Sequence, residues 1–81
     1  MENMMYLEQM LKLEEIHKEI QKEHTGNPSN FASKLHMSVP TLQRKLDGLR
    51  SIGAKISFDK ILQTYRYDNN FNLQVIISND D

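Results

Sequence analysis

The chain of 81 residues contains no cysteine. This absence excludes disulfide cross-links and thiolate metal sites, and it fits a reducing cytosol. Long apolar runs are absent as well, so we expect no segment that crosses a membrane. The first residues also lack the basic stretch with which a secretory signal begins. Together these absences favour a cytoplasmic protein.

Glycine and proline are scarce, with three and two residues in the whole chain. So few glycines leave no Gly-rich loop of the kind that cradles phosphate groups in nucleotide-binding proteins. Hydrophobic residues make up 38% of the chain, which is enough for one modest core but not for a deep substrate cavity as well. We therefore treat residues 1–81 as one domain and expect neither a small-molecule substrate nor a cofactor.

The sequence does not group the residue types that commonly carry catalysis. His36 falls on a different predicted element from His17 and His24, which are two helical turns apart with no further ligand between them. Glu14 and Glu15 are adjacent, so a helix points them in different directions and they form no acid–base pair. The sequence therefore predicts neither a metal site nor an enzyme.

Charge is unevenly distributed along the chain, although the formal net charge is only −1. Residues 1–24 carry a net charge of −3, residues 25–66 a net charge of +5 and residues 67–81 a net charge of −3. Because salt screens charges beyond about 8–10 Å, a basic middle segment can attract phosphate groups even between acidic ends. The alternative is that seven solvated cations simply keep a small domain in solution.

Two helices are predicted in the N-terminal half of the chain. Residues 4–24 contain no glycine or proline and repeat apolar residues at helical spacing, and Gly26 is expected to cap their C-terminal end. At about 20 residues this helix is longer than a three-helix core requires, so we expect its first turns to form a homodimer contact. Ser29 can cap a second, short helix that ends near Leu35.

A third helix is predicted between Ser38 and Gly53. Ser38 is expected to cap it, Pro40 is tolerated because first-turn amides have no partner within the helix, and Gly53 ends it. The expected buried stripe consists of Leu42, Leu46, Leu49 and Ile52.

The period of the hydrophobic pattern changes from helical to two after Gly53. Apolar and polar residues alternate over residues 54–59 and again over 64–67, which is typical of strands with one buried face. Residues 60–63 are the expected hairpin tip, and a further strand is expected at about residues 72–78. The predicted class is therefore α+β, with three helices followed by a β-hairpin and an extra strand.

Specific residues at specific spacings accompany this order of elements. They are Phe31, Ala32, Leu35, Ser38, Thr41, Leu42, Arg44, Leu46, Leu49, Gly53, Ile56, Phe58, Asp59, Tyr65 and Tyr67. In these residues the chain resembles the winged helix-turn-helix domain of bacterial transcription regulators, above all the biotin-repressor-like and DeoR-like domains. The match covers about residues 8–67. It implies sequence-specific binding of double-stranded DNA, transcription regulation and association with the nucleoid.

Helix-turn-helix proteins lay the second helix of the motif in the major groove of DNA. With the leucines of the third helix buried, its other face would present Gln43, which can pair with adenine, and Arg44, which can pair with guanine or a phosphate. Thr41 could contact a phosphate or a thymine methyl group. By the resemblance, Lys60 and Arg66 of the wing would reach the backbone or the minor groove. The complete set of expected DNA-binding residues is Lys34, Ser38, Thr41, Gln43, Arg44, Lys45, Arg50, Lys60 and Arg66.

Two features depart from the pattern of that family. The position of Pro40 is often basic there, and the wing tip is commonly rich in Lys and Arg, whereas here Ile61 and Leu62 follow Lys60. Exposed aliphatic residues are unfavourable unless they pack against something. A second hypothesis therefore stays open: a winged helix protein–protein interaction module without DNA-binding activity. The exposed face of the third helix could equally be an ordinary solvated surface.

Overall fold

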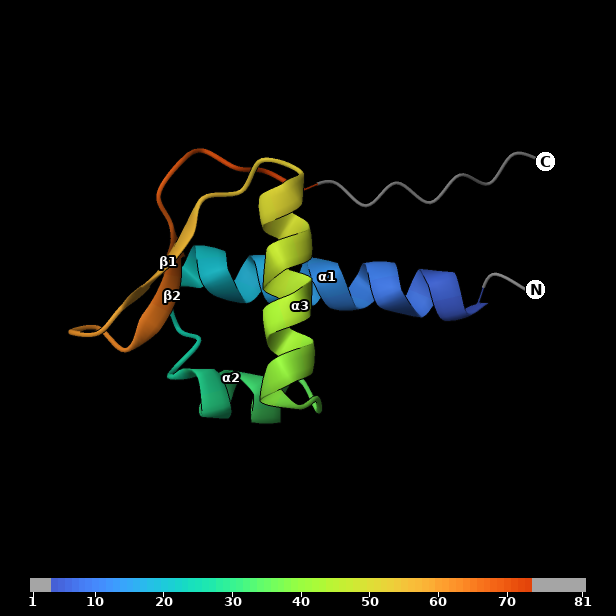
Figure 1. Cartoon of the computed structure of the whole chain (residues 1–81), viewed down its shortest axis with the longest axis horizontal. Helices are drawn as coiled ribbons and strands as arrows, with labels where there is room; N and C mark the ends of the chain where they lie inside the picture. Colours follow the sequence, from blue (N-terminus) through green and yellow to red (C-terminus); the bar gives the residue numbers. More distant parts are fainter. Residues whose placement is uncertain (1–3, 74–81) are drawn as a thin grey trace.

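The computed structural model describes residues 4–73. Figure 1 shows a long first helix, a third helix that crosses it, and a hairpin at the end of the molecule opposite the N-terminus. The class is α+β, as predicted, because three helices are followed by one antiparallel two-stranded sheet. In chain order the elements are α1 (Met4–Lys22), α2 (Pro28–Lys34), α3 (Val39–Ser51), β1 (Ile56–Asp59) and β2 (Thr64–Tyr67).

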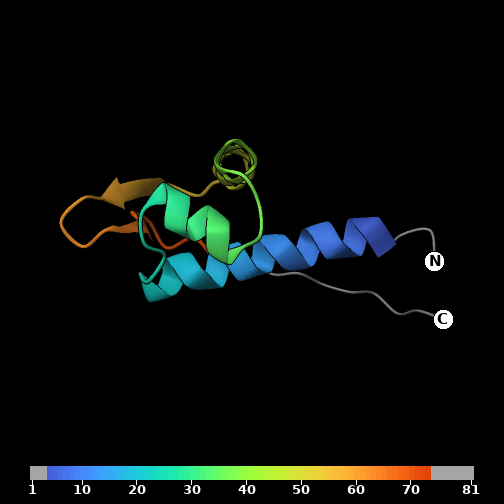
Figure 2. The ribbon, with the colours of Figure 1, turned by 90° about the horizontal axis from the view of Figure 1, so that it is seen from below.

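A single cluster of buried hydrophobic residues lies where the three helices meet the hairpin. Figure 2 shows α2 between α1 and α3. α1 contributes residues four apart, so that they fall on one face of the helix. The members of the cluster are Ile16, Ile20, Phe31, Ala32, Leu35, Leu42, Leu46, Leu49, Ala54, Ile56 and Tyr65.

The predicted buried stripe of α3 is confirmed for Leu42, Leu46 and Leu49, which have no exposed surface. The prediction for Ile52 is wrong, because its side chain is 60% exposed. Ile52 is the C-cap residue, where the backbone leaves helical geometry, so it no longer continues the stripe that the spacing predicted.

Side chains cap the beginnings of α2 and α3. Ser38 accepts a hydrogen bond from the Thr41 N–H at 3.2 Å, which confirms the predicted cap. The prediction for Ser29 is wrong, because Asn27 is the cap of α2 and accepts from the Asn30 N–H at 2.8 Å. Pro28 then occupies the first turn, where its missing N–H costs no hydrogen bond. α2 therefore begins earlier than expected.

Each of the three helices is followed, within two residues of its end, by a residue with positive φ. These residues are Glu23 (58°), His36 (59°) and Gly53 (114°). After each helix, two successive N–H groups donate back to carbonyl groups of the last turn, as in a Schellman motif. Gly53 confirms the predicted end of α3. Gly26 does not cap α1, since α1 ends at Lys22 and Glu23 takes the left-handed position.

The hairpin is tied to the loop that precedes α2. Residues 60–63 form its tip, as predicted, and Asp59 pairs with Thr64 at the end of the ladder. The Thr25 N–H donates to Thr64 Oγ1 at 3.1 Å, and the Tyr65 N–H donates to Thr25 Oγ1 at 2.9 Å. Thr25 and Thr64 are both buried, so these bonds satisfy polar groups that have no access to water.

The expected strand at residues 72–78 falls mainly outside the described residues. Residues 72 and 73 belong to no strand, and the rest of the predicted element lies beyond the range that the structure describes. Leu73 packs against the core. No helix within residues 4–73 has the length and apolar character needed to cross a membrane.

Candidate nucleic-acid interface

The α2–α3 pair is joined by a tight turn at His36 and Met37. The His36 N–H donates to the end of α2, and the same turn delivers Ser38 to the start of α3. Because the leucines of α3 face the core, the opposite face of that helix is exposed and carries Pro40, Arg44, Asp47, Gly48 and Ser51. Of the predicted DNA-binding residues, this face carries Arg44, and the hairpin tip carries Lys60.

Three of the predicted residues form a hydrogen-bonded row at the start of α3. Ser38 Oγ and Thr41 Oγ1 are 3.0 Å apart, and Arg44 Nη2 donates to Thr41 Oγ1 at 3.2 Å. The guanidinium group has five N–H donors, so this bond orients it and leaves most of its donors available. The row Ser38–Thr41–Arg44 therefore runs along the first two turns of α3, with half-buried Thr41 holding the exposed guanidinium group of Arg44.

The side chain of Gln43 extends from α3 toward the hairpin and does not point freely into solvent. Its Nε2 donates to the hydroxyl of Tyr65 at 3.0 Å, and its side chain is half-buried. A bidentate contact with adenine would need this amide group, so the bond to Tyr65 has to be exchanged before Gln43 can read a base. Gln43 thus ties α3 to β2, which no local pattern in the sequence indicates.

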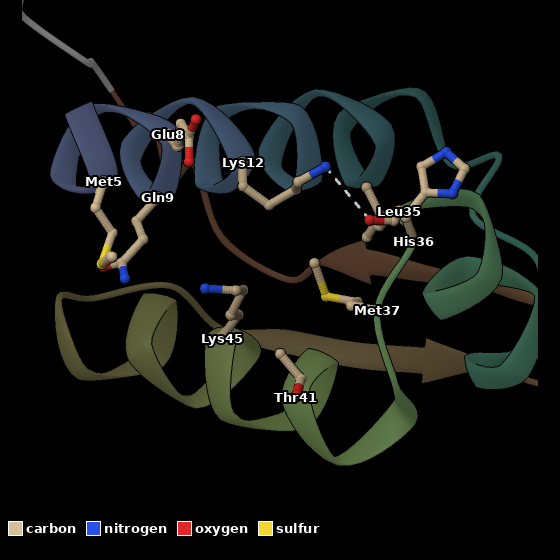
Figure 3. Close-up of a pocket in the computed structure, with 9 residues that line it drawn as sticks. All are labelled: Met5, Glu8, Gln9, Lys12, Leu35, His36, Met37, Thr41 and Lys45. Atoms are coloured by element: carbon tan, nitrogen blue, oxygen red, sulfur yellow. Dashed lines mark hydrogen bonds between the residues drawn. The ribbon is translucent and has the colours of Figure 1, made fainter.

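Lys45 is on the side of α3 that faces α1. A groove of about 350 Å³ lies between the first turns of α1 and the start of α3, and Lys45 and Thr41 line it (Figure 3). From α1, Glu8 and Lys12 line the same groove, and Lys12 Nζ donates to the Leu35 carbonyl oxygen at 3.3 Å. Lys45 is half-buried there and does not share the exposed face of Arg44.

Two of the expected phosphate-binding cations, although exposed, form ion pairs with carboxylates of the protein itself. Lys34 Nζ lies 3.7 Å from Glu19 and donates to a backbone carbonyl oxygen at 2.6 Å. Arg50 pairs with Asp47 at 3.0 Å and donates to the carbonyl oxygen of Ile56 at 3.1 Å. Either residue must exchange a carboxylate for a phosphate to bind DNA, so neither adds a full positive charge to the surface.

Arg66 is held between two carboxylates at the hairpin. Its Nη1 lies 3.5 Å from Asp59 Oδ2, and its Nε lies 3.9 Å from Asp68 Oδ1. Nε is buried and has no hydrogen-bond partner among the described residues. Arg66 therefore neutralises charge on β1 and in the segment after β2, and the cation exposed at the tip itself is Lys60.

Side chains that commonly bind metal ions do not cluster in the part of the chain that the structure describes. Among residues 4–73, no three His, Asp or Glu side chains lie close enough to hold a metal ion. What the surface offers chemically is a row of hydroxyl and guanidinium donors on α3 and a hairpin with one exposed cation. Comparison of the chain with protein-family models, with curated proteins and with solved structures finds no match.

Proposed function

We propose that the protein binds double-stranded DNA sequence-specifically, with the first half of α3 in the major groove, and that it regulates transcription. The observation that carries this proposal is the hydrogen-bonded row Ser38–Thr41–Arg44, which orients the exposed guanidinium group of Arg44. A guanidinium group that is already oriented loses little conformational freedom when it binds the two acceptors of a guanine edge. Arg44 is the base-reading residue in this proposal, and Gln43 positions α3 against the hairpin.

The internal pairing of Lys34, Arg50 and Arg66 limits how many phosphates one copy of the protein neutralises. Arg44 and Lys60 have no carboxylate within ion-pair distance among residues 4–73. Since each neutralised phosphate contributes a log–log salt slope of about −0.9, a single copy with two to four such contacts should give a slope of about −2 to −4.

Titration of a fluorescent duplex at two salt concentrations tests the proposal. We expect binding that weakens with salt, and a loss of about 1–3 kcal/mol in affinity for the preferred site in Arg44→Ala. Lys18→Ala is the matched control, because it removes one exposed cation from α1 and leaves the exposed face of α3 unchanged. Absence of binding to any duplex at low salt, or equal affinity in Arg44→Ala, contradicts the proposal.

The partner proposed alongside DNA is a second copy of the chain, bound through the first turns of α1. Met5, Tyr6 and Leu11 are 70%, 64% and 44% exposed there. A symmetric dimer would cover these side chains and double the DNA contacts, since paired half-sites suit paired reading helices. If DNA binding fails while this self-association holds, the protein-interaction module is the better description.

A further inference from the structure

The tip of the hairpin exposes two aliphatic side chains. Ile61 is 92% exposed and Leu62 is 59% exposed, which leaves Ile61 with more relative exposure than any other large hydrophobic residue among those described. They lie at the end of the molecule opposite the N-terminus of α1, where the hairpin projects from the core (Figure 1). Removing these two side chains from water would be favourable, so the tip gains free energy on contact with a partner that covers them.

The backbone of the tip is fixed by hydrogen bonds from within the hairpin. Asp59 Oδ1 accepts from the N–H groups of both Ile61 and Leu62 at 2.9 Å. Gln63 Nε2 donates to the Lys60 carbonyl oxygen at 2.7 Å and closes the other side of the loop. Because the loop is tied in this way, the two aliphatic side chains are presented together at its apex.

The one charged side chain within the tip, residues 60–63, is the cation Lys60, and the neighbouring carboxylate of Asp59 is engaged by other groups of the hairpin. The pKa of Asp59 lies below its ordinary value, chiefly because the Leu62 N–H donates to the carboxylate, with further contributions from Ile61 and Arg66. Its negative charge is thus held by these donors and paired with Arg66 at 3.5 Å. A partner at the tip would therefore meet exposed Lys60, Gln63 and two aliphatic groups, and its one charged contact within residues 60–63 would be with a cation.

The apolar surface of the tip is too small for a protein interface. Two aliphatic side chains such as these together have about 200 Å² of apolar surface, as their transfer free energies indicate. A specific protein–protein interface takes about 800 Å² from each partner, and somewhat more than half of that area is non-polar. One or two aliphatic side chains are, in contrast, the usual size of the wedges that enter the minor groove of DNA and separate a pair of stacked base pairs.

We propose that Ile61 and Leu62 act as such a wedge, entering the minor groove beside the site that α3 occupies and bending the DNA there. The inference rests on the proposed function. Figure 2 shows α3 on the side of the core opposite α1, with the hairpin extending beside it, so one duplex can run along both. Lys60 would contact the adjoining phosphate, and flexible pyrimidine–purine steps such as TA would be the preferred point of entry.

The test is a duplex carrying a fluorescence energy-transfer pair at its ends and 2-aminopurine at a central TA step. We expect the wild-type protein to bend it by an angle between about 20° and 90° and to raise the 2-aminopurine signal by unstacking. The double variant Ile61→Ser/Leu62→Ser should bind with the bend and the signal lost. Ile52→Ser is the matched control, since Ile52 is also exposed but lies at the end of α3.

The possible outcomes separate the wedge from the DNA-binding function. Arg44→Ala should weaken binding and leave the bend of the saturated complex unchanged. Salt-dependent binding to straight DNA, without unstacking, overturns the wedge and leaves the proposed function standing. Absence of binding to any duplex overturns both. A change in oligomeric state in the double variant, with the bend retained, assigns the tip to a protein contact and also overturns the wedge.

Discussion

At the scale of single residues, His17 is a polar group placed within the hydrophobic core. Its side chain is 3% exposed, and its Nδ1 lies 2.7 Å from the hydroxyl of Tyr67. The Leu73 N–H donates to Nε2 at 3.4 Å, so the partners assign the ring proton to Nδ1. Burial raises the pKa of Tyr67 to about 12, which keeps its hydroxyl protonated. Both groups are therefore neutral in the folded protein at neutral pH.

This arrangement predicts that the protein loses stability in mild acid. Burial lowers the pKa of His17 below 6.5, so the unfolded chain takes up a proton at a higher pH than the folded protein does. The free energy of unfolding should therefore decrease as the pH falls through 6.5 toward the folded pKa, and the loss should be absent above about pH 7.5. Urea unfolding at pH 7.5 and pH 5.5 measures it.

In this experiment the variant His17→Gln should lose most of the pH dependence. His24→Gln is the control, because His24 is exposed and should leave the dependence intact. An undiminished pH dependence in His17→Gln would show that another group is responsible.

At the scale of elements, local signals in the sequence predicted several helix ends. Hydrogen bonds between residues far apart in the same chain were not predicted. The cap at Ser38 and the end at Gly53 were predictable because the residues that form them lie within a few positions of one another. The bonds of Thr25 to Thr64 and of Gln43 to Tyr65 join residues 39 and 22 positions apart, so no spacing rule could indicate them. Asn27 could have been recognised, since an Asn before Pro is a common helix start.

The ends of the helices also predict a simple stabilising substitution. Glu23 has a φ of 58°, a conformation that costs a residue with a side chain about 1 kcal/mol relative to glycine. Glu23→Gly should therefore raise the free energy of unfolding by about 1 kcal/mol. Gly53→Ala should act in the opposite direction, because φ at that position is 114°. Urea denaturation of both variants checks the two signs, and equal or reversed shifts contradict this account of the caps.

At the scale of the whole molecule, the shape is elongated, with principal extents of 48 × 26 × 19 Å. α1 and the hairpin extend in opposite directions from the core, as Figure 1 shows. The core residues of α1 begin at Leu13, so its first turns have little beneath them besides the groove to α3. Sequence reasoning identified this surplus of helix from its length alone.

A dimer formed through α1 should be visible as a change of mass in solution. We expect light scattering to give twice the mass of the chain for the wild type and a lower, concentration-dependent mass for Leu11→Asp, because a charge in a buried contact is unfavourable. Gln21→Asp is the matched control, since it places the same charge on the exposed C-terminal half of α1. A monomeric wild type at high concentration argues against the dimer.

The charge of the folded surface is the property that the sequence predicted least well. Counting along the chain gives residues 25–66 a net charge of +5. The fold brings Glu19 to Lys34 and Asp68 to Arg66, and both carboxylates lie outside that segment. A one-dimensional count includes no partners from other elements, so it overstates how positive the surface is.

The bond between Gln43 and Tyr65 has a consequence for the geometry of a DNA site. It joins α3 to β2, so the distance between the two proposed DNA-contacting regions is set by the fold of the protein and does not adjust to the DNA. One base pair inserted between the major-groove bases and the bent step would move that step by about 3.4 Å and turn it by about 34–36° around the helix axis. In such a duplex, either α3 could contact its bases or the hairpin tip could contact its step, but not both at once.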